Sequence, residues 1–384
     1  MNLCRQLLLL LLLTFTTPFS ELYAAPPATV LFISPAHDDD LFWQQVEATM
    51  RHAARGLGLS LQVSYGNDSP LRAASLAHKA MSRQHKPAFI VLQFNGPVMP
   101  ELLRHAERQQ VRLLTINSQQ SALSRQQIGI PGQTYPLWLA HLWPDDQLAG
   151  RLEAEALLQA AKTRWPEQPV VSLLAFNGAI NDVSLVAQQR SQGMRQALRG
   201  QPDAALAQEF AEYWNVEKAT HPLTAALQRY PEATVLWSAN DAFALRLRER
   251  LKQAGKPLDA YLLAGIDATP QGLAAVERGE LVTTIGGHFM EGAWAMVLIY
   301  DYLHLPAAQW QPVYQQTGMH AFDREQISLL RRITESGALA KLDYRAMTRT
   351  AFLAKHSSRT QWQGYPFTWQ ALLATLQQQQ LLTP

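Results

Sequence analysis

The sequence predicts an α/β protein of two lobes, each built on a parallel sheet with helices on both faces. Short apolar runs alternate with longer amphipathic stretches from about residue 29 to residue 285. The alternation pauses near residues 142–145 and then restarts, and a length of 384 residues suits two globular units better than one. Strands that alternate with helices form parallel sheets, which need helices on both faces.

The first 25 residues are predicted to be a secretory signal peptide. An unbroken apolar run, Leu7–Leu13, follows Arg5, and the small residues Ala24 and Ala25 mark a cleavage site after one of them. The run is too short to span a membrane, although an uncleaved anchor stays open as an alternative. Cys4 is the single cysteine and lies before the run. The mature chain therefore has no thiol, which excludes disulfides, cysteine-ligated metals and cysteine nucleophiles.

The first unit opens with a buried strand at residues 29–33. Phe42, Val46, Met50, Ala53 and Leu57 then share one face of a helix, which Gly56 and Gly58 end. The further elements expected in this unit are strands at 59–65, 89–92 and 111–116 and a helix at 100–110.

The second unit repeats this cycle. We expect strands at 170–175, 207–212, 234–237, 261–266 and 282–285, with helices at 147–161, 185–198, 220–229 and 243–254. Gly286-Gly287 is expected to serve the backbone where the chain crosses between the lobes. The predicted division is residues 26–142 plus 286–312 for the first lobe and 143–285 plus 313–345 for the second. The polar region from Asp323 is expected to hold a last strand and, over 346–384, a C-terminal extension.

Polar and aromatic residues gather where the predicted strands end. Ligands of open parallel sheets bind beyond the carboxyl ends of the strands. Amides and carboxylates can hold vicinal hydroxyls, and the ten Trp and eleven Tyr of the chain include rings that could stack on a sugar. Each such residue alone could equally be a helix N-cap, and each ring could be core, but six strand ends share the pattern. The candidate ligand contacts are Asp40, Phe42, Trp43, Asn95, Asn117, Asn177, Gln188, Arg190, Trp214, Asn240, Asp267 and His288.

Metal-binding and catalytic motifs are weak or absent. His37-Asp38-Asp39-Asp40 offers clustered carboxylates, but the glycine and terminal glutamate of a calcium loop are missing, so a solvated loop before a helix is the better interpretation. His288 lacks the second histidine of a zinc helix. There is no phosphate loop, nucleophile elbow or dinucleotide fingerprint. We therefore expect no metal, no cofactor and no enzymatic activity. A formal net charge of +2 without a basic stripe argues against a nucleic-acid partner.

Several motifs, in order along the chain, resemble those of the type I periplasmic sugar-binding proteins of the ribose and galactose kind, which share their fold with LacI-type regulators. The segments that carry the resemblance are Asp40-Leu41-Phe42-Trp43, Arg190-x-x-Gly193, Ser238-Ala239-Asn240-Asp241-x-x-Ala244, Gly265-Ile266-Asp267-x-x-Pro270-x-Gly272 and Val282-Thr283-Thr284-Ile285. The resemblance covers about residues 29–305. It implies two lobes joined by three crossovers, with the ligand between them and Asp40, Phe42, Trp43, Asn117, Asn240 and Asp267 among its contacts.

The chain departs from this family at three positions. Asn117-Ser118 stands where sugar binders often have Asp-Arg, Gln188 where an arginine often binds sugar, and Gly286-Gly287-His288 where a glutamine is common. These changes argue against ribose and galactose and leave another sugar, a polyol or a signalling molecule open.

The expected role is that of a monomeric periplasmic protein that delivers a small polar ligand to the permease of an ABC importer. A co-sensor for a membrane histidine kinase or cyclase is the alternative, and a periplasmic hydrolase on the same fold is a third, weaker one.

Overall fold

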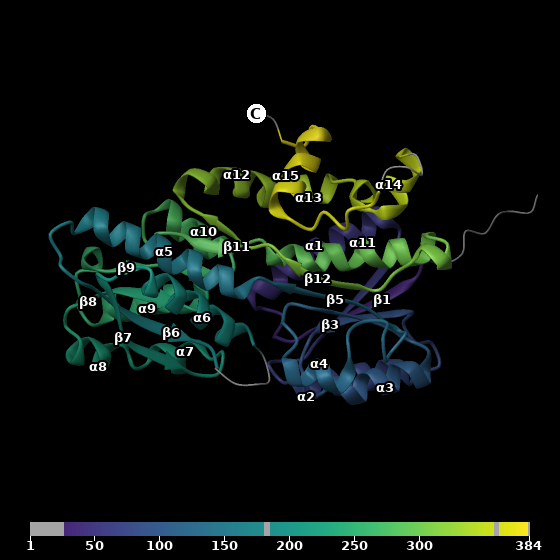
Figure 1. Cartoon of the computed structure of the whole chain (residues 1–384), viewed down its shortest axis with the longest axis horizontal. Coiled ribbons are helices and arrows are strands. Elements are labelled where there is room, and N and C mark those ends of the chain that lie inside the picture. Colours follow the sequence, from purple (N-terminus) through teal and green to yellow (C-terminus); the bar gives the residue numbers. More distant parts are fainter. Residues whose placement is uncertain (1–26, 180–184, 357–360, 383–384) are drawn as a thin grey trace, which may run out of the picture.

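The computed structural model describes residues 27–179, 185–356 and 361–382, and it consists of two α/β lobes side by side (Figure 1). The predicted signal peptide lies outside the described residues. The first lobe contains a six-stranded parallel sheet in the order β12-β5-β4-β3-β1-β2. Its strands are β1 (Thr29–Ser34), β2 (Ser60–Tyr65), β3 (Phe89–Gln93), β4 (Arg112–Ile116), β5 (Trp138–Pro144) and β12 (Val313–Thr317).

Side chains of β1 alternate between two apolar cores, which explains why its sequence is apolar throughout. Val30 and Phe32 face the core that includes α1 (Leu41–Leu57) and α11 (Glu291–His304), whereas Leu31 and Ile33 face the opposite core. That second core is covered by α2 (Pro70–Met81), α3 (Met99–Gln109) and α4 (Ala122–Ile128). A strand buried on both faces needs no polar side, so its hydrophobic run is continuous.

The second lobe has a four-stranded parallel sheet in the order β7-β6-β8-β9 and a small sheet in the order β10-β11-β13. The strands are β6 (Val171–Asn177), β7 (Ala204–Ala211), β8 (Ala233–Ser238), β9 (Leu262–Leu263), β10 (Gly265–Ile266), β11 (Thr284–Gly286) and β13 (His320–Phe322). The helices are α5 (Asp146–Arg164), α6 (Val186–Arg199), α7 (Val216–Thr220), α8 (Leu223–Arg229), α9 (Asp241–Gln253) and α10 (Pro270–Glu277). Short 3₁₀ helices occur at Leu258–Ala260, His288–Met290, Ala307–Gln309 and Tyr344–Met347.

The chain passes between the lobes three times, as expected. It crosses from β5 to α5, from β11 to the turn before α11, and from β12 to β13. Gly287 has a φ of 112°, a conformation that favours glycine, and a Cβ on Gly286 would lie 2.5 Å from that of Ala268. The two-lobed α/β fold with parallel sheets is therefore confirmed, and the glycine pair does serve a crossover.

Four details of the sequence-based prediction are wrong. Residues 313–317 form β12 beside β5 in the first lobe, not part of the second lobe. No strand follows Asp323 among the described residues, where the chain is helical instead. The expected helix at 220–229 is two helices interrupted at Pro222, because proline has no N–H for the helix. The expected strand at 261–266 divides into β9 and β10, which belong to different sheets.

The C-terminal helices lie over the side of the molecule where α1 and α11 pack (Figure 1). They are α12 (Arg324–Glu335), α13 (Ala338–Lys341), α14 (Arg349–Lys355) and α15 (Trp369–Gln378). Helix α12 packs on α10 of the second lobe, and α13 packs on α1 of the first. Phe367 stacks on Trp294 at 5.1 Å, and Trp369 meets Phe322 edge-on at 5.1 Å. This segment therefore contacts both lobes.

Asp301 of α11 anchors the C-terminal segment, and its loss should be costly. Its buried carboxylate accepts hydrogen bonds from the backbone N–H of Arg349 at 2.7 Å and from the N–H and hydroxyl of Thr350 at 2.9 and 2.6 Å. Asp301→Ala should lower the free energy of unfolding by about 2–4 kcal/mol, since three donors lose a charged acceptor. Urea unfolding measures the loss. Asp39→Ala, an exposed position, is the control, and equal stabilities of the two variants would contradict the anchor.

Candidate functional site

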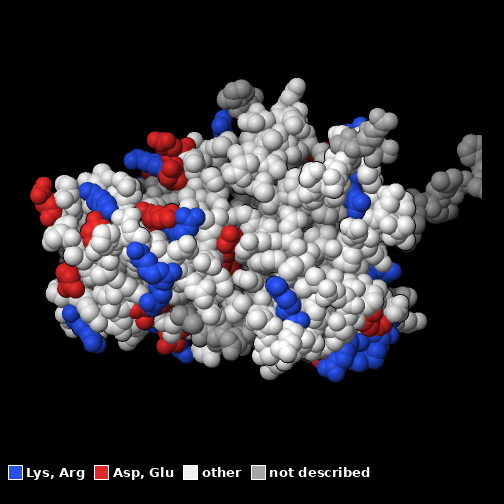
Figure 2. Space-filling view, viewed as in Figure 1, with Lys and Arg blue, Asp and Glu red and all other residues white. Residues whose placement is uncertain are grey.

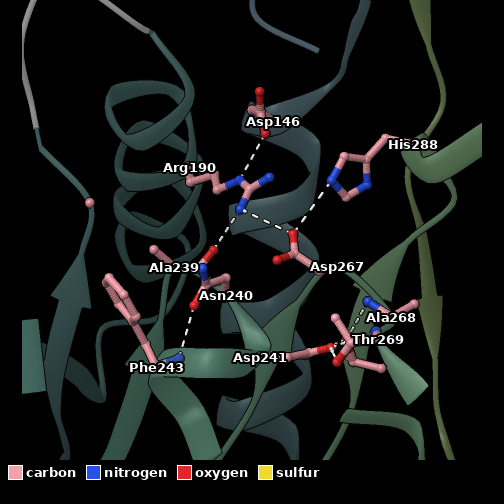
Figure 3. A network of polar contacts seen from close by, with 12 residues as sticks. Asp146, Arg190, Ala239, Asn240, Asp241, Phe243, Asp267, Ala268, Thr269 and His288 are labelled. Atoms are coloured by element: carbon pink, nitrogen blue, oxygen red, sulfur yellow. Dashed lines mark hydrogen bonds and ion pairs between the residues drawn. The ribbon is translucent and has the colours of Figure 1, made fainter. Parts of the chain in front are cut away.

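Arg190 of α6 is the centre of a buried polar network at the junction of the lobes (Figure 3). The residue is 3% exposed. Its Nε donates to Oδ1 of Asp146 at 2.8 Å, and its Nη1 donates to the carbonyl oxygen of Ala239 at 2.6 Å. Nη1 also lies 3.7 Å from Oδ1 of Asp267. The guanidinium thus joins the start of α5, the end of β8 and the end of β10.

Asp267 is held in an unusual backbone conformation directly after β10. Its φ is 119°, and that of the next residue, Ala268, is 51°, both uncommon for residues other than glycine. Strain of this kind persists where the surroundings over-determine it, often at functional sites. Burial raises the pKa of Asp267 to about 7, although the Arg190 charge lowers it. The helix α10 is capped by Thr269, so the alternative that Asp267 caps this helix is wrong.

His288 connects the two lobes at this point. Its ring stacks on that of Phe42 in the first lobe at 4.4 Å, and its Nε2 lies 3.5 Å from Oδ1 of Asp267 in the second. The residue is 1% exposed. Burial and then the Arg190 charge lower the pKa of His288 to about 3, so the ring is neutral at physiological pH.

Asp40 approaches the network from the first lobe. Its Oδ1 accepts from the N–H of Trp43 at 2.9 Å, so it caps α1, as the solvated-loop interpretation expected. The residue keeps an exposed surface, but its carboxyl is enclosed enough that burial raises its pKa to about 6, with the charges of Asp267 and Asp68 adding to the rise.

Of the three predicted aromatic contacts, two are nearly buried and one is exposed. Phe42 and Trp43 are 8% and 9% exposed, and they differ in their neighbours: Phe42 stacks on His288, whereas Trp43 packs against Phe32 with centroids 6.2 Å apart. Trp214 is 41% exposed, and the guanidinium of Arg190 lies 5.8 Å from its ring centroid. Trp214 is therefore the most accessible of the three rings, and Trp43 has mainly a packing role.

The predicted amide contacts fall into two groups. Asn117 accepts from Gln93 Nε2 at 3.1 Å, and the amide oxygen of Asn95 is buried without a hydrogen-bond partner among the described residues. These amides lie at the ends of β4 and β3, and Gln188 is partly exposed on the first turn of α6.

The amides of the second group have partners within their own lobe. Asn177 is fully buried, and its side-chain amide forms hydrogen bonds with Ala187, Glu209 and Gly178. The side chain of Asn240 caps α9 through the N–H of Phe243 at 2.9 Å.

Sequence reasoning missed three acidic residues of this region: Asp146, Asp241 and Glu291. Asp146 follows β5, so the strand-end rule could have found it. Asp241 accepts from the Thr269 N–H and hydroxyl, each at 2.8 Å, and from the Thr284 hydroxyl at 2.6 Å. It holds the loop that carries Asp267 (Figure 3). No sequence pattern pointed to Glu291, because its partners are distant in the chain.

Glu291 ties three elements together near the crossovers. It accepts from the N–H of Asn117 at 2.7 Å and from the hydroxyl of Thr317 at 2.6 Å. Burial raises the pKa of Glu291 to about 8, and these two hydrogen bonds oppose the rise. The folded protein therefore holds a proton here at neutral pH.

The raised carboxyl pKa values predict that stability falls as the pH rises to about 8. A group with a raised pKa contributes stability that is fully present below its unfolded pKa and is lost as the pH rises through its folded pKa. Asp241, Asp267 and Glu291 have folded pKa values of about 7, 7 and 8, against about 4 in an unfolded chain, so their contribution is lost between about pH 4 and 8. Histidines that are buried in the neutral form act in the opposite direction below about pH 6.5, so the net fall in melting temperature should be clearest between about pH 6.5 and 8. Glu291→Gln, which mimics the protonated form, should flatten the fall, and parallel curves for the two proteins would contradict the assignment.

A model of the periplasmic binding protein domain matches residues 30–304. The ribose import binding protein RbsB of Escherichia coli (strain K12) is 26% identical over 147 residues, which are 38% of this chain and 46% of that protein. The matched part is thus about half the length of the curated relative. None of the helices within the described ranges is long and apolar enough to cross a membrane.

Solved structures share the fold over most of the chain. A periplasmic sugar-binding protein from Pseudomonas fluorescens has a TM-score of 0.76 and 29% identity, and the match covers 90% of this chain and 99% of that one. A solute-binding protein from Actinobacillus succinogenes 130z with bound D-allose has a TM-score of 0.68 and 17% identity over 79% of this chain and 99% of its own. The matching family consists of solute-binding proteins rather than enzymes. The chain belongs to the periplasmic binding protein family, with a two-lobed fold of type I and relatives that bind sugars.

Proposed function

We propose that this protein captures a sugar or polyol between its lobes in the periplasm and delivers it to an ABC importer. One observation carries the proposal. The Phe42 ring stacks on His288, His288 lies beside Asp267, and Asp267 lies beside Arg190, so this row of neighbouring side chains crosses the junction between the lobes. Its members come from both lobes, so a ligand that touches them would favour one relative position of the lobes over others.

The chemistry of these groups suits a polyhydroxyl ligand. Arg190 donates in a fixed fork, Asp267 accepts, and Gln93, Asn95 and Asn117 offer amides that can do both. Trp214 offers an accessible ring face for the apolar side of a sugar. Relatives named for ribose and D-allose, and a structural neighbour named for myo-inositol, are similar to this chain, which supports sugars and polyols as the class to test.

A thermal-shift screen of the mature chain against sugars and polyols tests the proposal, followed by titration calorimetry with the compound found. Asp267→Asn should weaken binding about tenfold to a hundredfold, since ligand hydroxyls lose a charged acceptor. Asparagine is preferred to alanine here because it has the shape of aspartate and adopts a positive φ more often than alanine does. Asp259→Asn, an exposed position in the same lobe, is the control. Unchanged affinity in Asp267→Asn would refute the proposed site.

Export is a separate part of the proposal. Mass spectrometry of the protein released by osmotic shock should find Ala25 or Pro26 at the N-terminus. Intact Met1 in a membrane fraction would instead identify an anchored protein.

A co-sensor role is the second candidate, and one observation favours it. The C-terminal helices lie beyond the residues that match the family model, and they contact both lobes. They therefore form a surface whose shape depends on the position of one lobe relative to the other. Ligand uptake in a deletion strain separates the two roles: lost uptake supports the importer, whereas normal uptake with lost ligand-dependent gene expression supports the sensor.

A further inference from the structure

The polar network at the lobe junction carries more negative than positive charge. Asp40, Asp146 and Asp267 supply three carboxyls, and Arg190 supplies the one guanidinium that contacts two of them, at 2.8 Å and 3.7 Å. His288 is the other basic group in contact, and its ring is neutral, since burial and then the Arg190 charge lower its pKa to about 3. With all three carboxyls ionised, their negative charge would exceed the positive charge of Arg190 by two.

The uncompensated carboxylates belong to opposite lobes. Asp40 caps α1 in the first lobe and forms no ion pair with any described residue, whereas Asp267 directly follows β10 in the second and shares Arg190 with Asp146. Phe42, two residues after Asp40, is linked to Asp267 through the ring of His288. Any motion that brings the lobes closer brings like charges together, which costs free energy unless a cation or a proton lies between them.

Some buried polar atoms of the network lack hydrogen-bond partners within the described part of the chain. Oδ2 of Asp146 and both ring nitrogens of His288 are buried and accept or donate no hydrogen bond among the described residues. The side chains of these two residues are 1% exposed. If the Nε2–H of His288 faces Asp267, its Nδ1 is a free acceptor. A carboxylate oxygen and an imidazole nitrogen both need a donor, and an ammonium group is a donor without being an acceptor.

We propose that the ligand is a cationic amino polyol or amino sugar whose ammonium group lies between Asp40 and Asp267, with its hydroxyls on the neighbouring amides. This inference rests on the proposed function and narrows its ligand class. The ring faces of Phe42 and Trp214 also suit a cation, because aromatic faces attract positive charge. The raised pKa values of Asp40 and Asp267 fit the same picture, since burial makes an unpaired negative charge costly at both carboxyls and a bound cation would relieve that cost.

Matched probe pairs test the charge: D-glucamine against D-sorbitol, and D-glucosamine against D-glucose, by titration calorimetry. At about pH 7 the amine of one pair should bind at least about tenfold more tightly than its neutral partner. At about pH 5 the preference should shrink, because protons then neutralise the carboxyls. Measurements in buffers of different ionisation enthalpy should show proton release when the amine binds.

Asp40→Asn is the decisive variant, since asparagine caps a helix as well as aspartate does. The variant should lose the preference for the amine, so that the two members of each probe pair bind with similar affinity, whatever the absolute affinity of the variant. Asp38→Asn, an exposed residue of the same loop, should keep the preference.

Each remaining outcome overturns the inference. Equal or tighter binding of the neutral members would exclude a cationic ligand and leave the proposed function intact. Failure of both amines to bind at millimolar concentration would also exclude a cationic ligand. Failure of the whole sugar and polyol panel to bind would refute the proposed function as well. Stabilisation by calcium chloride that Asp40→Asn abolishes would assign the carboxylates to a metal instead.

Discussion

Replacing Arg190 with methionine is expected to lower the free energy of unfolding by about 3–5 kcal/mol at neutral pH. The change leaves Asp146 and Asp267 buried without a cation, at side-chain exposures of 1% and 11%. It also removes the donor to the carbonyl of Ala239. The carboxyls can escape part of the penalty by taking up protons, so the loss should be smaller at about pH 5 than at about pH 8. Urea unfolding at the two pH values measures both effects.

Arg151→Met provides the control for this prediction. Arg151 pairs with Glu155 on the outside of α5, where the two side chains are 35% and 45% exposed. An exposed pair of this kind contributes about 0–1 kcal/mol. Similar losses for Arg190→Met and Arg151→Met would mean that the buried network contributes little to folding.

Replacing Gly193 with alanine should destabilise the second lobe by about 3 kcal/mol, because α5 and α6 pack with their backbones in contact. A Cβ on Gly193 would lie 1.9 Å from the carbonyl oxygen of Gln147, and one on Gly150 would lie 1.9 Å from that of Arg190. Backbone atoms cannot rotate away as a flexible side chain can, so the helices must move apart. Such a shift also moves Arg190 relative to Asp146, so ligand affinity should fall with stability.

Gly56→Ala is the matched control on a helix of the first lobe. A Cβ there would meet Tyr344 at 3.7 Å, an ordinary contact, and alanine is the better helix former by about 0.5–1 kcal/mol. Thermal unfolding should therefore show Gly56→Ala equal to or above the parent protein. A Gly193→Ala variant with the stability of the parent would show that the two helices can separate without cost.

The candidate site was predictable from sequence only where a residue stands at a strand end. Asp267 and Asn117 were found in this way, and both adopt a positive φ that the sequence does not reveal. The same rule also selected Asn177 and Asn240, and the structure shows the other use of a polar residue at a strand end, since Asn177 bonds within its own lobe and Asn240 caps a helix. Trp43 was chosen with Phe42 from one motif, and only the direction of each side chain separates a core ring from one at the junction.

The sequence by itself determined the order and type of most elements, because those depend on local periodicity. The apolar run of β1 and the helical face from Phe42 to Leu57 are examples. The tertiary structure alone decided which distant segments meet. It placed β12 beside β5, it brought Glu291 to Asn117 and Thr317, and it closed Arg190 onto Asp146 and Asp267. Such contacts depend on how whole elements pack, and the burial that raises the carboxyl pKa values exists only after they have packed.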